Sequence, residues 1–113
     1  MTYTFPDHIN NDTFEGAEFT MSLNAAPMNI SNTNIRMQLR KSYNSDVVFD
    51  LDSADSEIII TNGTAGLFRI PKQVIGVPLP GVYQHDIQFT FPNGDVKTYI
   101  SGTWKITGDI TRP

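Results

Sequence analysis

The clearest evidence for the fold class of this chain is the segment Gly81-Val-Tyr-Gln-His-Asp-Ile-Gln-Phe-Thr-Phe-Pro-Asn-Gly-Asp-Val-Lys-Thr-Tyr-Ile-Ser-Gly-Thr-Trp-Lys-Ile-Thr107. Successive side chains of a strand point to opposite faces, so its first half places Tyr83, His85, Ile87, Phe89 and Phe91 on one face. Pro92-Asn-Gly-Asp95 follows, and Asn and Gly accept the positive φ angles of a tight hairpin turn. The stretch therefore predicts a β-hairpin.

The returning strand of this hairpin has the same period of two. Its predicted common face consists of Val96, Thr98, Ile100, Gly102, Trp104 and Ile106. We expect Trp104, the single tryptophan of the chain, to lie in the core or at its edge.

Further strands are predicted upstream of the hairpin. Alternating or β-branched segments occur at residues 16–23, 35–40, 47–51, 58–60 and 67–70, and turn-forming residues separate them. Pro71 to Gly76 is predicted to form a single helical turn, since proline is tolerated at the first helical position. About seven to eight short strands without a normal helix indicate an all-β fold, a single immunoglobulin-like antiparallel β-sandwich.

The length of 113 residues leaves room for one domain. Residues 14–113 are predicted to form the sandwich domain. Residues 1–13 are mostly polar and contain Pro6, so they are predicted to form an N-terminal arm. We expect such terminal segments to be mobile unless contacts hold them.

The composition disfavours several classes of partner. A formal charge of −4 and a pI near 4.8 argue against nucleic-acid binding, which requires a basic face. The absence of cysteine excludes disulfides and thiolate metal sites and fits folding in a reducing cytoplasm. No apolar run approaches the ~18 residues of a membrane span, so no membrane partner is expected.

No group of residues has the pattern of a catalytic or metal site. Asp50, Asp52 and Asp55 are close in sequence, but the spacing and central glycine of a calcium loop are missing, so solvated turn residues are the favoured interpretation. His85 is expected to be a partly buried, satisfied histidine, and His8 a plain residue of the arm. Nucleophile elbows, phosphate loops and zinc helices are also absent. We therefore predict a protein that is not an enzyme and has no cofactor.

The arm and the sheet edges are the features that predict an interaction. An open sandwich leaves unpaired backbone groups along its edge strands. Tyr3 and Phe5 lie on the arm, and Phe14 lies where the fold begins; these three residues are the candidate interface. Two interpretations stay open: the arm adds as a strand to a neighbour's sheet edge, or it packs on its own domain.

A second hypothesis is a carbohydrate-binding module. Sites of this class stack sugars on exposed aromatic rings. Four residues of the chain could supply such rings: Tyr43, Tyr83, Tyr99 and Trp104.

An ordered series of short blocks resembles a known family. The blocks are Asn34-Ile-Arg-Met-Gln-Leu-Arg40, Ile58-Ile-Ile-Thr61, Gly66-Leu-Phe-Arg-Ile70, Pro80-Gly-Val-Tyr-Gln-His-Asp-Ile87, Phe91-Pro-Asn-Gly-Asp95 and Gly102-Thr-Trp-Lys-Ile-Thr-Gly-Asp-Ile-Thr-Arg112. In this order they are similar to the small immunoglobulin-like accessory proteins of tailed bacteriophages, and to the N-terminal domain of upper baseplate proteins. The resemblance spans about Phe19 to Arg112.

The resemblance implies a structural protein of the virion, with no catalytic residues to carry over. The expected role is an assembly or adaptor module of the tail, baseplate or fibre attachment region. It would bind other virion structural proteins through edge strands and the arm, in multiple copies of a symmetric assembly. The alternative is a capsid-surface decoration or head-fibre protein with carbohydrate or host-surface binding. In either case the protein would fold in the host bacterial cytoplasm and end in the virion.

Overall fold

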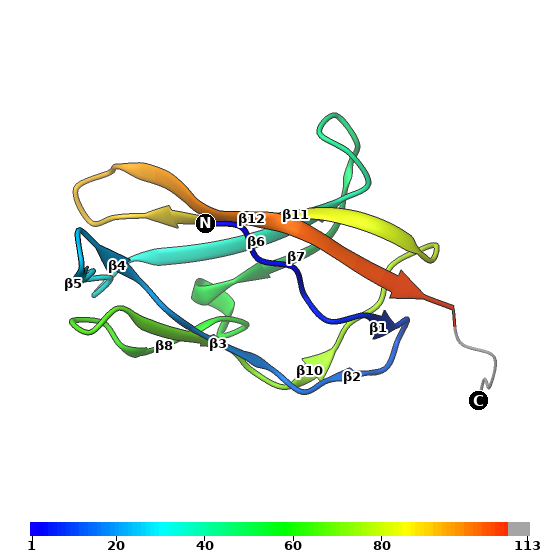
Figure 1. Cartoon of the computed structure of the whole chain (residues 1–113), viewed down its shortest axis with the longest axis horizontal. Helices are drawn as coiled ribbons and strands as arrows, with labels where there is room; N and C mark the ends of the chain where they lie inside the picture. Colours follow the sequence, from blue (N-terminus) through cyan, green and yellow to red (C-terminus); the bar gives the residue numbers. More distant parts are fainter. Residues whose placement is uncertain (109–113) are drawn as a thin grey trace.

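The computed structural model describes residues 1–108 and is all-β (Figure 1). A single 3₁₀ turn, η1 (Ser53–Asp55), occurs in this range. The strands are β1 (His8–Ile9), β2 (Thr13–Phe14), β3 (Ala17–Thr20), β4 (Ser22–Leu23), β5 (Ala26–Pro27), β6 (Asn34–Arg40), β7 (Val47–Asp52), β8 (Ile59–Asn62), β9 (Leu67–Ile70), β10 (Gln73–Val74), β11 (Gly81–Thr90) and β12 (Val96–Thr107).

The strands are arranged in two layers (Figure 1). One layer is a five-stranded sheet in the order β1-β12-β11-β6-β7. The other contains the three-stranded sheet β3-β9-β8 and the pair β10-β2, and the short hairpin β4-β5 lies at one end. Phe68 of β9 and Phe89 of β11 meet edge to face between the layers, with ring centroids 5.6 Å apart. The hydrophobic core therefore fills the space between the sheets.

The hairpin predicted from residues 81–107 is confirmed as β11 and β12. Tyr83, His85, Ile87 and Phe89 are buried, while the side chains between them are exposed. Gly94 has φ of +94°, and the Phe91 amide donates to the Asp95 carbonyl over 2.8 Å to close the turn. The register of this pair fixes the rest of the five-stranded sheet, because β11 pairs with β12 on one side and β6 on the other.

The predicted common face of the returning strand is wrong at its start. The register shifts opposite Ile87 and Gln88, where β12 contains one extra residue. Such a bulge reverses the alternation, because one inserted residue moves every earlier side chain to the other face. Val96 and Thr98 are consequently exposed, whereas Ile100, Trp104 and Ile106 are buried as predicted.

The helical turn predicted for residues 71–76 is also wrong. The segment instead contains β10, whose Gln73 pairs with Phe14 of β2. The Ile75 amide donates to the Asp12 carbonyl and the Asn11 amide donates to the Ile75 carbonyl, at 3.2 and 3.0 Å. Pairing with this distant segment satisfies the backbone groups that an isolated helical turn would leave free.

The five-stranded sheet is mixed, which corrects the expectation of a purely antiparallel fold. β1 pairs with β12 in parallel, with His8 beside Ile106. The N-terminal residues therefore run in the same direction as the last strand. Seven of the strands within residues 1–108 are four residues or longer, close to the number predicted. The end of the predicted domain, residues 109–113, lies outside the described residues.

Candidate binding surfaces

The N-terminal arm is seated on the edge of β12. Thr2 forms a parallel bridge with Ser101. The Tyr3 amide donates to the Ser101 carbonyl at 2.9 Å, and the Phe5 amide donates to the Thr103 carbonyl at 3.3 Å. The arm thus covers the edge that β12 would otherwise leave unpaired.

Phe5 anchors the arm in the core. Its side chain is 1% exposed and stacks on Trp104, with ring centroids 4.1 Å apart. The Trp104 indole Nε1 donates to the Pro6 carbonyl at 3.0 Å, so the backbone beside Phe5 is held as well. Of the two interpretations left open by the sequence, packing on the arm's own domain is the one found here.

His85 lies beneath the arm. Its Nε2 is 2.7 Å from the Tyr3 carbonyl oxygen, and because a carbonyl only accepts, Nε2 is the donor. Nδ1 is buried without a hydrogen-bond partner among the described residues. Burial lowers the pKa of His85, against smaller raising effects of the Tyr3 carbonyl and Asp86. The ring is therefore neutral at pH 7.

Gly102 makes the close approach of the arm possible. A Cβ at this position would collide with the Tyr3 carbonyl, and it would lie 3.1 Å from His85 Nε2. Glycine at position 102 thus lets the arm backbone approach both β12 and the imidazole.

His8 is not the plain arm residue that the sequence suggested. Its side chain is 7% exposed, and Nε2 donates to the Ile75 carbonyl at 2.9 Å. Asn10 makes a similar link, because its side-chain amide donates to and accepts from the backbone of Val77. These contacts across 67 residues of sequence could not be recognised from local pattern.

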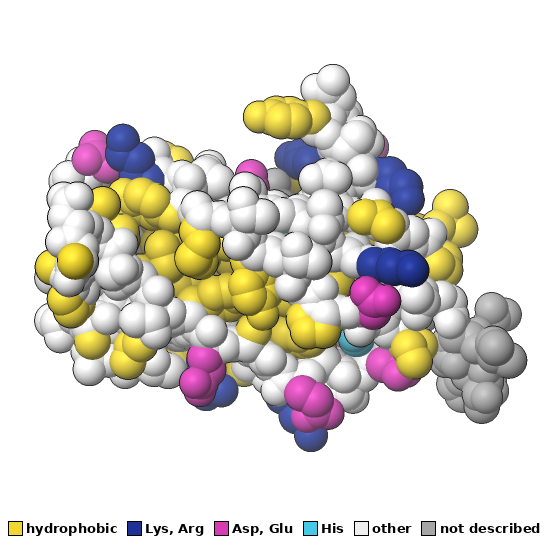
Figure 2. Space-filling model, viewed as in Figure 1, with side chains coloured by type: hydrophobic (Ala, Val, Ile, Leu, Met, Phe, Trp, Pro, Cys, Tyr) yellow, Lys and Arg dark blue, Asp and Glu magenta, His cyan; other side chains and the backbone are white. Residues whose placement is uncertain are grey.

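Half-buried hydrophobic side chains pack against the core from the arm and from the edge strands β2, β3 and β12. We use the name apolar opening for four of these side chains: Tyr3 of the arm, Phe14 of β2, Ala17 of β3 and Tyr99 of β12. Tyr3 reaches across the opening to Phe19 of β3, with ring centroids 5.0 Å apart. Figure 2 shows hydrophobic side chains gathered over this region, between the edge strands of the two layers.

The three predicted interface residues therefore differ in accessibility. Tyr3 and Phe14 are partly accessible and belong to the apolar opening. Phe5 lies in the core, in contact with both Phe14 and Trp104. Phe5 can act at this surface only by holding the arm in place.

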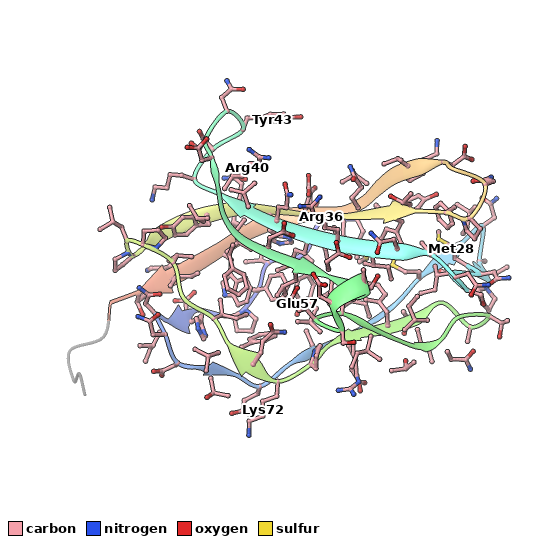
Figure 3. All side chains as sticks on the ribbon, turned by 180° about the vertical axis from the view of Figure 1, so that it is seen from behind. Met28, Arg36, Arg40, Tyr43, Glu57 and Lys72 are labelled. Atoms are coloured by element: carbon pink, nitrogen blue, oxygen red, sulfur yellow. The ribbon has the colours of Figure 1, made fainter. Side chains whose placement is uncertain are left out.

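A second surface lies on the outer face of the five-stranded sheet. The β6–β7 loop rises above the sheet, and Tyr43 projects from it sideways with Arg40 beneath (Figure 3). The hollow between this loop and the sheet has a volume of about 820 Å³. Its lining includes Gln38, Gln84 and Asp86. We call this the Tyr43 hollow.

The floor of the Tyr43 hollow is polar. Asp86 of β11 pairs with Gln38 of β6 on one side and with Ser101 of β12 on the other. Gln84 is the next outward-facing residue of β11 and pairs with Arg40. Side chains directly opposite on neighbouring strands are about 5 Å apart, so these groups form a continuous surface.

The acidic residues near the end of β7 have structural roles. Asp50 binds the Arg36 guanidinium, and its Oδ1 accepts from Nε at 3.1 Å. Asp52 caps η1, since its carboxylate accepts from the Ala54 amide at 2.9 Å. Among residues 1–108, no three His, Cys, Asp or Glu side chains are grouped as metal ligands. No helix in the same range is long and apolar enough to cross a membrane.

Comparison of the chain with protein-family models and with curated proteins finds no match.

The polar floor was missed by sequence reasoning. Gln38, Gln84 and Asp86 looked like ordinary solvent-facing residues of separate strands. The sequence feature that could have indicated this floor is the repeated occurrence of amide and acid side chains on the outer faces of the predicted strands 35–40 and 81–90. Only the strand order places them side by side beneath Tyr43.

Proposed function

We propose that the protein is a non-enzymatic structural protein of a tailed bacteriophage particle, with an immunoglobulin-like β-sandwich that joins neighbouring particle proteins. Its all-β architecture is compatible with that sandwich type. The ordered series of sequence blocks, from Asn34 to Arg112, supports the phage assignment. Function is not implied by fold, so a surface must carry the assembly role.

The apolar opening is the observation that carries the proposal. Contiguous exposed apolar surface on a small domain marks an interaction site, because water contact with it is unfavourable. Tyr3 and Tyr99 present aromatic rings there, and tyrosine is enriched in protein interfaces. The partner in this proposal is a neighbouring protein of the tail, baseplate or fibre attachment region, contacted by each copy in a symmetric assembly.

The arm supports this role by completing the surface. Tyr3 reaches the opening only while Phe5 is inserted against Trp104 and the Tyr3 carbonyl accepts from His85. In the proposed particle, the arm therefore stays packed on its own domain and forms part of the contact surface. It does not add as a strand to the sheet of a neighbouring protein. In the alternative proposal, the same surface attaches the protein to the outside of the capsid.

Particle incorporation tests the proposal. The gene is supplied in trans to a phage that lacks it, and the protein content of purified particles is measured by quantitative mass spectrometry. We expect the wild-type protein in the particles and at least a tenfold loss for Tyr99→Glu, because a carboxylate placed in an apolar contact must be desolvated.

Lys97→Glu is the matched control, since Lys97 is an exposed residue of the same strand. Circular dichroism and thermal melting of each variant establish folding, and Ala17→Arg on the facing strand serves as the second variant. Absence of the wild-type protein from particles would refute the assignment to a particle. Normal incorporation of both folded opening variants would refute the apolar opening as the contact.

A further inference from the structure

The exposure of Tyr43 is unusual among the aromatic residues of this chain. Its side chain is 96% exposed, whereas Tyr83 and Trp104 are buried at 3% and 0%. Burying a large aromatic side chain stabilises a fold, and a ring left in solvent does not contribute that stabilisation. The proposed assembly role of the apolar opening does not involve the Tyr43 ring.

The loop that carries Tyr43 is held in place by its own hydrogen bonds. The Arg40 guanidinium donates to the Ser45 carbonyl at 2.7 Å, and the hydroxyls of Ser42 and Ser45 are 2.7 Å apart. A second Arg40 nitrogen donates to Gln38 Oε1 at 3.2 Å, which ties the loop to the floor of the hollow. These bonds hold the loop backbone that carries Tyr43, and the ring projects from this loop above the sheet (Figure 3).

Polar groups on the floor are free to bind a ligand. Among the described residues, the structure gives no hydrogen-bond partner to the side chains of Gln84, Asp86, Thr98 and Ser101, and all four are exposed. Gln38, Asp86 and Ser101 form one row across three strands. The row measures roughly 10 Å, since strands are about 4.8 Å apart. It thus offers donors and acceptors over the length of a short oligosaccharide.

From this arrangement we propose that the Tyr43 hollow is a binding site for a neutral glycan. The ring of Tyr43 packs on the C–H face of one pyranose. The hydroxyl groups of the sugar can each donate and accept a hydrogen bond. They bind the polar side chains of the floor, which are the amides of Gln38 and Gln84, the carboxylate of Asp86 and the hydroxyl of Ser101. Such a site combines an apolar platform with a few polar groups that fix orientation.

Charges of both signs line the hollow, because Arg40, Lys41 and Asp86 all belong to it, and the two cations already have partners in the protein. Arg40 is engaged by the loop carbonyl and by Gln38. The Lys41 ammonium lies 5.1 Å from the centre of the Tyr83 ring, so it is directed to that residue. Among the floor side chains without a partner in residues 1–108, Asp86 is the charged one, and its carboxylate would repel an anionic group placed directly on the floor.

Two other classes of ligand fit less well. A peptide that adds as a strand needs free backbone groups, but β6, β11 and β12 are each paired on both sides. A nucleic acid could stack a base on Tyr43, but it needs a basic groove, and the chain has a net charge of −4.

A glycan array tests this site in the full-length protein. The array carries microbial surface polysaccharides with chitotriose, maltotriose and mannotriose, and sialic acid oligomers serve as the anionic comparison. We expect binding to a neutral glycan, and at least a tenfold rise in its Kd for both Tyr43→Ala and Asp86→Ala. Asn44→Ala, an exposed neighbour in the same loop, is expected to bind as the wild type does.

Three results would overturn the proposal: no binding to any neutral glycan, preferential binding to the sialic acid oligomers, or unchanged binding by both Tyr43→Ala and Asp86→Ala. We expect Tyr43→Ala to fold as the wild type does, because the Tyr43 side chain is almost entirely in solvent. The site goes beyond the assembly role, and particle incorporation of Tyr43→Ala reports separately on that role.

Discussion

At the residue scale, His85 is the most unusual group of the fold. Its ring is 4% exposed, one nitrogen supports the arm through the Tyr3 carbonyl, and the other has no partner within residues 1–108. Protonation of Nδ1 would place an unpaired charge in the core, which is costly. Burial consequently lowers its pKa in the folded protein.

This lowered pKa makes stability depend on pH in a defined direction. Below about pH 6.5 the unfolded chain protonates His85 while the folded protein does not, so the free energy of unfolding falls as acid is added. The loss begins near pH 6.5 and ends where the folded histidine itself protonates. Well above pH 6.5 both states are neutral, and His85 contributes no pH dependence.

Urea unfolding of the wild type and His85→Gln at pH 7.5, 6.5 and 5.5 measures this effect. Glutamine can donate to the Tyr3 carbonyl but does not titrate. We expect the wild type to lose more stability than the variant between pH 6.5 and 5.5, because the two proteins differ in this one titratable group. Parallel pH profiles of the two proteins would contradict the assignment.

At the element scale, the arm is a structural part of the domain. Sequence pattern could identify a polar N-terminal segment with two aromatic residues, but not the groove that receives them. That groove is formed by Trp104, His85 and Gly102, which lie some 80 to 100 positions away along the chain. The arm is therefore ordered by contacts that only the closed fold supplies.

Phe5→Ala tests the energetic role of the arm. Removing a fully buried phenylalanine costs about 3–5 kcal/mol of unfolding free energy, from lost transfer energy and the cavity left against Trp104. Thr4→Ala, at the exposed neighbouring position, should change stability by less than about 0.5 kcal/mol. Chemical denaturation measures both. Similar stabilities of the two variants would mean that the arm is not part of the cooperative unit.

At the scale of the whole molecule, the two proposed surfaces are separate. The apolar opening lies between the layers, while the Tyr43 hollow lies on the outer face of the five-stranded sheet. Substitutions at distant sites without shared partners act additively. The molecule can therefore be held by one surface while the other remains in solvent.

A double variant tests this independence. Tyr43→Ala should abolish glycan binding and leave particle incorporation unchanged, and Tyr99→Glu should do the reverse. The variant with both substitutions should show both losses and no further fall in melting temperature beyond the sum of the single effects. Loss of incorporation by Tyr43→Ala alone would show that the surfaces are coupled.

Local sequence pattern is sufficient to predict the strands whose alternation is long and regular. In residues 81–90 the inward and outward faces follow directly from a period of two, and the turn follows from the backbone freedom of Gly94. These features are local, so they can be read without knowing which segments meet. Short strands such as Gln73–Val74 were missed because two residues carry no periodic signal.

The positions of the strands relative to one another could not be predicted from local pattern and are known from the folded structure. The bulge in β12 reversed the faces of Val96 and Thr98, and the parallel seating of the arm buried Phe5 and His8. The same strand order brought Gln38, Asp86 and Ser101 into one row beneath Tyr43. The physical reason is that register and edge pairing arise from contacts between residues far apart in sequence, and such contacts exist only once the two layers have closed on their core.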